Sequence, residues 1–200
     1  DYVANPVNRC YFCKAELFQH LVPFAESQGL KVIAYGENAS DVGDYRPGRQ
    51  AADQFKIRAP LREVGLTKDE IRALSREMGI PTADKPAMPC LSSRIPYGEE
   101  VNVEKLGMIE AGEALIRGRG YSDVRLRLHE LKDGYLARIE LAEHDLGTFL
   151  VRGDLNSMVH SLTQLGFRHV TLDLKGYRRG SLNEGLASET REAASELNQA

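Results

Sequence analysis

Three cysteines carry the chemistry that the sequence first suggests. Cys10 and Cys13 stand three residues apart, and Cys90 is the third cysteine of the chain. On a helix, positions i and i+3 point to the same side, so the first two thiols would form a pair of soft-metal ligands near a helix start. If the loop around Cys90 folds over that helix, three thiolates meet. Three cysteine ligands leave one iron of a [4Fe–4S] cluster open for substrate or sulfide.

Other interpretations of these cysteines stay open. A CxxC pair also serves as a dithiol–disulfide couple or as a buried pair, and Cys90 alone could be a structural cysteine. Zinc would require a fourth ligand, for which His20 is the nearest histidine. With no export signal in view, an odd number of cysteines predicts a reducing, cytoplasmic setting in which the thiols bind metal or react.

Two arginines form a second candidate site. Arg125 and Arg127 alternate with apolar residues on a predicted strand, so their guanidinium groups share one face, about 7 Å apart. Such a pair suits a phosphate or a carboxylate. The alternative is a solvated face on which they stand beside Glu140 or Arg138 of the partner strand.

Positive charges also stand beside the cysteines. Arg94, four residues after Cys90, could stabilise a thiolate or an anionic substrate. Lys14 directly follows Cys13 and could steer anions to the thiols, although a surface lysine is an equally simple interpretation.

Polar residues follow a predicted buried strand over 31–36. Asn38, Asp41 and Asp44 come just after its carboxyl end, the edge at which open α/β sheets bind ligands. A carboxylate there could hold Mg²⁺ on the phosphates of a nucleotide. Asn and Asp are also favoured in ordinary turns.

The hydrophobic pattern predicts two domains. The first is part of a parallel α/β sheet over 1–95, and the second is a smaller α+β domain over 96–185 with the order αββαβ. A tail over 186–200 is expected to be frayed. The first expected helix begins after a cap at Asn5 or Asn8, carries both cysteines of the CxxC pair and ends near residue 28. Further helices are expected over 68–78, 100–118 and 145–165, and strands over 31–36, 57–61, 123–130, 135–141 and 169–174.

Composition adds weaker limits. The 200 residues carry a net charge of −3, which gives no reason to expect nucleic-acid binding. No apolar run approaches the roughly 20 residues of a membrane span.

Three stretches resemble one known family. NRCYFCK (8–14), GENASDVGDYRPG (36–48) and PCLSSRIPYG (89–98) are similar, in this order, to segments of LarE, an ATP-dependent sulfur transferase family of nickel-pincer nucleotide biosynthesis. LarE belongs to the PP-loop ATP pyrophosphatases, which have an adenine nucleotide alpha hydrolase-like fold. The resemblance runs from about residue 5 to residue 184.

The resemblance implies a specific reaction. LarE proteins use ATP and Mg²⁺ to adenylate a carboxylate of pyridinium-3,5-biscarboxylic acid mononucleotide, and then install sulfur to give the bis-thiocarboxylate. In one branch a cysteine matching Cys90 gives up its own sulfur and becomes dehydroalanine. A second branch carries the additional CxxC, here Cys10 and Cys13, and holds a [4Fe–4S] cluster. The three cysteines favour this cluster branch.

The resemblance also implies roles for other residues, and a homo-oligomeric assembly. The nucleotide cofactor would be bound by Gly36, Asn38 and Asp41. The substrate would be bound by Lys14, Ser93, Arg94, Glu113, Arg125 and Arg127.

One expected signature is absent. The PP-loop sequence Ser-Gly-Gly-x-Asp-Ser does not occur in these 200 residues, which begin at Asp1. We expect the first strand and the PP-loop to precede the printed chain. Two competing functions stay open, namely a tRNA thiolase of the same superfamily and a non-catalytic zinc module built on the three cysteines and a histidine.

Overall fold

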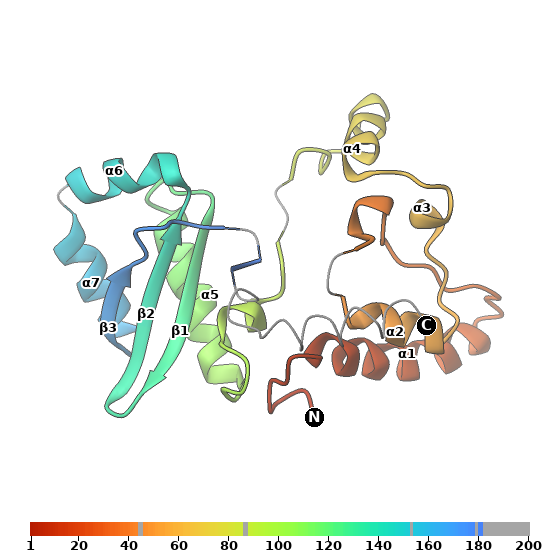
Figure 1. Cartoon of the computed structure of the whole chain (residues 1–200), viewed down its shortest axis with the longest axis horizontal. Helices are drawn as coiled ribbons and strands as arrows, with labels where there is room; N and C mark the ends of the chain where they lie inside the picture. The colour runs from red at the N-terminus through yellow and green to blue at the C-terminus, as the bar shows by residue number, and fades with distance from the viewer. Residues whose placement is uncertain (44–45, 86–87, 153, 179, 182–200) are drawn as a thin grey trace. The chain divides into compact units, whose positions relative to one another are not determined.

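The computed structural model describes residues 1–43, 46–85, 88–152, 154–178 and 180–181 (Figure 1). These residues form two compact units, which are described separately. Among them, the first unit comprises Asp1–Tyr2 and Asn8–Met88, and the second comprises Val3–Val7 and the residues from Pro89 onward. The predicted tail over 186–200, like Asp44, lies outside the described residues.

The first unit is built on one long helix. Helix α1 (Arg9–Ser27) runs without interruption through Pro23 and ends before Gly29, whose φ of +68° is the left-handed conformation that favours glycine. Helix α2 (Gly48–Gln54) packs on α1. Phe18 contributes its buried ring to the core between them, together with Ala51, Ala52 and Ile57. This packing holds the cysteine-bearing turn of α1 in place.

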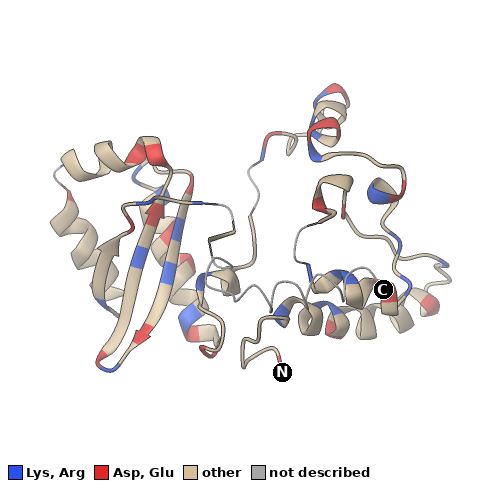
Figure 2. Cartoon of the chain, viewed as in Figure 1, with Lys and Arg blue, Asp and Glu red and all other residues tan. Residues whose placement is uncertain are grey.

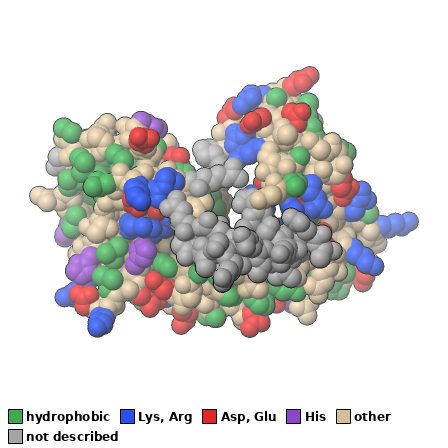
Figure 3. All heavy atoms as spheres, viewed as in Figure 1, with side chains coloured by type: hydrophobic (Ala, Val, Ile, Leu, Met, Phe, Trp, Pro, Cys, Tyr) green, Lys and Arg blue, Asp and Glu red, His purple; other side chains and the backbone are tan. Residues whose placement is uncertain are grey.

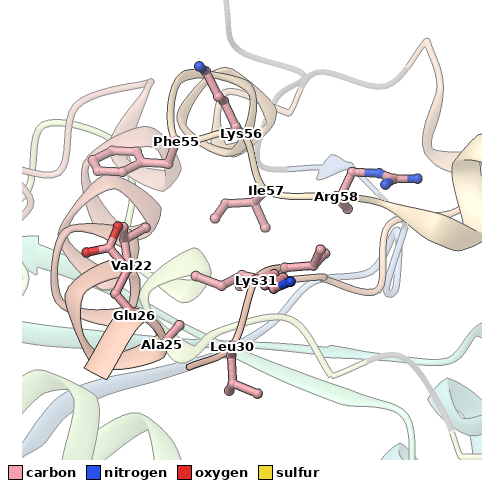
Figure 4. Close-up of a pocket in the computed structure, with 11 residues that line it drawn as sticks. Val22, Ala25, Glu26, Leu30, Lys31, Phe55, Lys56, Ile57 and Arg58 are labelled. Atoms are coloured by element: carbon pink, nitrogen blue, oxygen red, sulfur yellow. The ribbon is translucent and has the colours of Figure 1, made fainter. Parts of the chain in front are cut away.

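The parallel sheet predicted for this unit is reduced to one contact among the described residues. A parallel bridge joins Ala34 to Arg58, in place of strands over 31–36 and 57–61. The second strand prediction is wrong because Pro60, which cannot donate to a sheet ladder, starts helix α3 (Pro60–Glu63). The side chains of Leu30 and Val32 are more than half exposed. They flank the pocket of about 300 Å³ shown in Figure 4.

The capped helix is confirmed. Helix α4 (Lys68–Glu77) begins at Thr67, whose Oγ1 accepts from the backbone N–H of Glu70, while the Glu70 carboxylate accepts from Thr67 N at 2.8 Å. This reciprocal pair satisfies two donors that a helix start leaves unpaired. Gly79, with a φ of +67°, follows the last turn.

The second unit is a three-stranded sheet covered by helices. Strand β1 (Val124–Leu131) pairs antiparallel with β2 (Gly134–Leu141), and β2 pairs parallel with β3 (Phe167–Leu172). The order β1-β2-β3 confirms the predicted hairpin. Helix α5 (Val103–Arg117) is capped by Asn102, whose Oδ1 accepts from Lys105 N at 2.9 Å, and it packs on β1.

The single helix predicted over 145–165 is wrong. Two helices, α6 (Glu143–Val151) and α7 (Leu155–Gln164), occupy this region, so the observed order is αββααβ. The residues between them, Arg152 to Asp154, include a glycine, which disfavours a continuous helix. Helix α7 packs on β3 and buries Met158 and Leu162. The molecule is therefore a mixed α/β protein.

None of the described helices is both long enough and apolar enough to cross a membrane.

Candidate functional site

The cysteine pair lies at the start of α1. Asn8 is the residue before the first helical turn, but its side chain makes no capping bond there. Cys10 and Cys13 are both exposed, one helical turn apart. Each of the chain's three cysteines lies in a described stretch, and none of them forms a disulfide. The structure thus confirms the i, i+3 placement of these two thiols on one helix.

Beside this turn lies a pocket of about 270 Å³, here called the Lys14 pocket. Three residues that were predicted to bind substrate or nucleotide, Lys14, Gly36 and Asp41, meet in its wall. Four more lining residues were not predicted, namely Tyr35, Glu37, Arg46 and Arg49.

Glu37 is the buried centre of this wall. Its carboxylate accepts from Tyr35 Oη at 2.5 Å and from Arg49 Nε at 2.8 Å, and it pairs with Arg62 at 2.9 Å. Burial opposes ionisation of Glu37, yet these hydrogen bonds and the two guanidinium charges lower its pKa below the usual value. Burial and the bond to Glu37 raise the pKa of Tyr35. Glu37 is therefore held as a charged carboxylate by the donors around it.

Lys14 contributes the pocket's amine. Its Nζ lies 4.3 Å from the centroid of the Tyr35 ring, and burial lowers the pKa of the amine. Gly48 makes room for the stem of this lysine. A Cβ on Gly48 would stand 2.8 Å from Lys14 Cδ and 3.2 Å from the carbonyl oxygen of Cys10. One glycine thus fits α2 against both the lysine and the cysteine turn.

The predicted nucleotide residues are engaged with one another. Asn38 Oδ1 accepts from Ser40 N at 3.0 Å, and Asp41 Oδ2 accepts from Asn38 N at 3.2 Å, which caps the short 3₁₀ turn η1 (Ala39–Asp41). The other oxygen of Asp41 pairs with Arg46 at 2.7 Å. Both the turn-forming interpretation and the pocket placement therefore hold for Asp41, and binding of a nucleotide or Mg²⁺ stays a prediction.

Cys90 starts a tight turn in the second unit. Its exposed thiol precedes the 3₁₀ helix η2 (Leu91–Arg94), and residues 90–94 are here called the Cys90 turn. The carbonyl of Cys90 accepts from Ser93 N at 3.0 Å and from Ser93 Oγ at 2.8 Å. Arg94 Nη1 donates to the carbonyl oxygens of Pro89 and Cys90 at 3.0 and 3.3 Å. The backbone is thus fixed while the thiol stays accessible.

The predicted site residues Arg94 and Glu113 form a buried ion pair. Arg94 Nε and Nη2 donate to the two carboxylate oxygens at 2.7 and 3.1 Å, and Glu113 is fully buried. Glu113 also accepts from Leu126 N at 3.1 Å and pairs with Arg117. Gly112 permits this approach of α5 to the sheet, because a Cβ there would stand 2.6 Å from Leu126 Cδ1.

The two strand arginines lie on the polar face of the sheet, where Figure 2 shows basic residues on β1 and β2 and Figure 3 shows charged side chains gathered. Arg127 makes a bidentate pair with Glu140, with both distances 2.9 Å. Arg125 lies with its guanidinium carbon 4.5 Å from the centroid of Tyr177 and donates to Val124 O at 2.8 Å. The proposed pairing with Glu140 is confirmed, but both arginines are buried rather than solvated.

The sequence interpretation of the site missed several residues. Alternation on β1 identified the arginine face and named Glu140 only as a pairing partner of the arginines. Tyr177 lies in an irregular segment after β3, so no periodic pattern marked it. Glu37 and Arg49 stand in or next to a recognised motif, but an isolated charge there carries no signal of burial.

Metal ligands are not gathered in the described parts of the chain. No group of three or more His, Cys, Asp or Glu side chains is placed there to hold a metal ion. His20, the predicted fourth zinc ligand, is exposed and lies 3.0 Å from the Glu16 carboxylate on the same helix. The cluster and the zinc site therefore stay predictions.

No protein-family model matches the chain. The uncharacterized protein slr1717 of Synechocystis sp. is 46% identical over 186 residues, which cover 93% of this chain and 68% of that protein. The pyridinium-3,5-bisthiocarboxylic acid mononucleotide synthase of Lactiplantibacillus plantarum, a LarE protein, is 36% identical over 187 residues, 93% of this chain and 66% of the synthase. The chain belongs to the LarE family. It spans about two thirds of the length of these curated relatives.

A more distant similarity agrees with this assignment. The tRNA-specific 2-thiouridylase MnmA of Azorhizobium caulinodans, a PP-loop family member, is 30% identical over 125 residues, 52% of this chain and 31% of that enzyme. The predicted membership of the LarE family is confirmed by the two relatives that match 93% of the chain.

Proposed function

We propose that this LarE-family protein is an ATP-dependent sulfurtransferase that acts on pyridinium-3,5-biscarboxylic acid mononucleotide. The proposal is supported by the similarity to the Lactiplantibacillus plantarum synthase over 93% of the chain. One structural observation supports a role for a specific residue, Cys90. The accessible Cys90 thiol begins a turn whose backbone is bonded to a buried arginine, as a nucleophile or ligand requires.

The reaction begins with the nucleotide. A substrate carboxylate attacks the α-phosphate of ATP, pyrophosphate leaves, and an acyl-adenylate forms. We assign ATP and Mg²⁺ to the segment that carries Gly36, Asn38 and Asp41. The amine of Lys14 and the guanidinium of Arg125 suit the phosphate and carboxylate groups of the substrate.

Sulfur then replaces AMP on the activated carbonyl. A [4Fe–4S] cluster held by Cys10, Cys13 and Cys90 would leave one iron open and supply a sulfide. The alternative is sacrificial transfer, in which the Cys90 thiolate displaces AMP to give a thioester. Removal of the Cys90 α-proton then breaks the Cβ–Sγ bond, leaving a thiocarboxylate on the substrate and dehydroalanine at position 90. Both routes need Cys90.

The decisive experiment reconstitutes the full-length protein anaerobically with iron and sulfide. We expect about four irons per chain and a broad visible absorption band in the wild type, both abolished in Cys10→Ala, Cys13→Ala and Cys90→Ala. His20→Ala is the matched control and should keep the iron, whereas loss of metal in this variant would favour the zinc module.

Product analysis by mass spectrometry separates the two sulfur routes. With the cluster route, the protein keeps its mass after turnover and thiolates the substrate repeatedly. A protein that loses the mass of H₂S in a single turnover supports the sacrificial route. If the wild type, supplied with ATP, thiolates no pyridinium mononucleotide under either condition, the proposed function is wrong.

A second candidate function is supported by the similarity to the tRNA 2-thiouridylase, namely transfer of sulfur to tRNA. The net charge of −3 argues against it. Thiolation of tRNA in the same assay would replace the leading proposal. A homo-oligomeric assembly and a cytoplasmic location remain predictions.

A further inference from the structure

A hydrogen bond from the sheet reaches the backbone of the Cys90 turn. Arg127 Nη1 donates to Ser93 O at 2.7 Å. Ser93 N and Ser93 Oγ in turn donate to the carbonyl oxygen of Cys90. A chain of two hydrogen-bonded steps therefore links the guanidinium of a buried strand residue to the backbone of the proposed sulfur-handling cysteine.

The remaining donors of Arg127 are directed into the protein. Nε and Nη2 donate to the two oxygens of Glu140 at 2.9 Å, and Nη2 also donates to Ser181 Oγ at 2.8 Å. The side chain of Arg127 is 7% exposed and that of Glu140 is 1% exposed. A guanidinium has five N–H groups, and four of them are accounted for by these bonds. Arg127 is thus placed to hold protein groups rather than a ligand.

We propose that Glu140 and Arg127 are positioning residues, which fix the Cys90 turn to the sheet, and that Arg127 is not a substrate ligand. Glu140 orients the guanidinium by bidentate pairing, and the guanidinium orients the Ser93 carbonyl. The other side of the same turn is held by Arg94, which the fully buried Glu113 orients from α5. Two buried ion pairs, one from the sheet and one from a helix, therefore determine where Cys90 lies.

The two ion pairs matter because a reacting thiol must be held in a defined position. Displacing a reacting group by about 1 Å can reduce a rate by about a hundredfold, because alignment contributes much of the catalytic effect. The thiol of Cys90 is exposed and lies in an irregular segment rather than within a helix or strand of regular geometry. Bonds from buried charged groups supply the rigidity that this segment lacks.

The proposal separates two classes of kinetic effect. A ligand arginine, when removed, weakens substrate binding and raises KM, whereas a positioning arginine lowers kcat and leaves KM unchanged. We expect Arg127→Gln and Glu140→Gln in the full-length protein to lower kcat by about a hundredfold with KM within about twofold of wild type. This kinetic arm rests on the proposed function.

Arg138→Gln is the matched control. Arg138 shares the sheet face with Arg127 and pairs with the same carboxylate at 3.2 Å, and it also pairs with Asp173 at 3.4 Å. This variant disturbs the same charge cluster without removing the bond to Ser93. We expect it to keep the wild-type kcat and KM.

A second experiment tests the same proposal without substrate. Amide hydrogen exchange reports the Ser93 N–H bonded to Cys90 O and the Ile95 N–H bonded to Ser92 O. Loss of the Arg127 bond should speed exchange of these amides about tenfold in Arg127→Gln and Glu140→Gln, with α1 amides unchanged. Arg127→Lys, which keeps the charge but loses the bidentate geometry, serves if the glutamine variant fails to fold.

The outcomes are distinct. A raised KM with unchanged kcat in Arg127→Gln, or unchanged exchange of the Ser93 and Ile95 amides, would overturn the inference. A wild-type protein that thiolates no pyridinium mononucleotide would overturn the proposed function instead, and the exchange measurement would still decide whether the two residues fix the turn.

Discussion

The Lys14 pocket in the first unit and the Cys90 turn in the second unit both combine buried carboxylates with arginines, but they leave different groups accessible. In the Lys14 pocket, Glu37 gathers two guanidinium groups and a tyrosine hydroxyl, and a cavity of about 270 Å³ remains beside the amine. At the Cys90 turn, Glu113 and Glu140 also each contact two arginines, but each makes a bidentate pair with one of them, Arg94 or Arg127. These two arginines hold backbone carbonyls of the turn.

The difference teaches how to interpret a charged residue at a functional site. A cation beside a cavity, such as Lys14, can receive a ligand anion. A guanidinium whose donors are satisfied by protein acceptors, such as that of Arg127, acts on the protein itself. Both residues carry a positive charge and both were predicted to bind substrate, so only their partners distinguish the two roles.

The largest effect on stability is expected from Glu113→Gln. The carboxylate is fully buried and pairs with Arg94 and Arg117, so loss of its charge leaves buried Arg94 without a counter-ion. Breaking such a buried pair typically costs about 3–5 kcal/mol. Urea unfolding of the second unit should show this loss, and Glu104→Gln on the exposed side of α5 is the control. A cost below about 1 kcal/mol would mean that the pair is not structurally important.

Much of the fold could be predicted from the sequence. Period-2 alternation placed β1 and β2 within a residue or two, and the Thr67–Glu70 pattern predicted the start of α4. Those signals are local, because side-chain spacing and capping chemistry depend on neighbouring residues. The wrong assignments have equally local causes, namely Pro60 at a helix start and a glycine between α6 and α7.

The sequence predicted which residues belong to the site better than it predicted which groups each of them contacts. Spacing indicated that Arg125 and Arg127 share a face, and the structure agrees. Strand pairing also suggested Glu140 as a neighbour of the arginines. The spacing could not indicate that Arg125 stacks on Tyr177 or that Arg127 is bound to Ser93, which lies 34 residues away along the chain. Long-range pairing depends on the fold, which a motif does not encode by itself.

A smaller effect is expected from Gly48→Ala in the Lys14 pocket. The new methyl group would stand 3.2 Å from Cys10 O and 2.8 Å from Lys14 Cδ, so α2 or the lysine stem must shift. Overpacking of this kind costs roughly 1–3 kcal/mol, and a displaced amine should also weaken ATP or substrate binding several-fold. Thermal unfolding and calorimetric titration of the full-length protein measure the two effects.

Gly107→Ala on α5 is the control for Gly48→Ala, because no atom lies within 4 Å of a Cβ at that position. The helix propensity of alanine should make this control neutral or more stable by up to about 1 kcal/mol. Equal stability and equal binding in the two variants would show that Gly48 has no packing role. Gly48 would then not connect the Lys14 pocket to the first turn of α1, which carries Cys10.

The smallest effect concerns the pH dependence of the sheet face. Burial and the charges of Arg138 and Arg127 lower the pKa of His129, and its Nε2 has no hydrogen-bond partner among the described residues. Below the ordinary value of about 6.5, the unfolded chain therefore takes up a proton that the folded protein still refuses, so the free energy of unfolding falls as pH decreases from 6.5 to the lowered pKa. His129→Gln should remove this part of the pH dependence, whereas His160→Gln, exposed on α7, should retain it. Urea unfolding at several pH values between 5 and 7.5 measures the slope. Identical slopes in wild type and His129→Gln would mean that burial and the neighbouring arginines do not lower the pKa of His129.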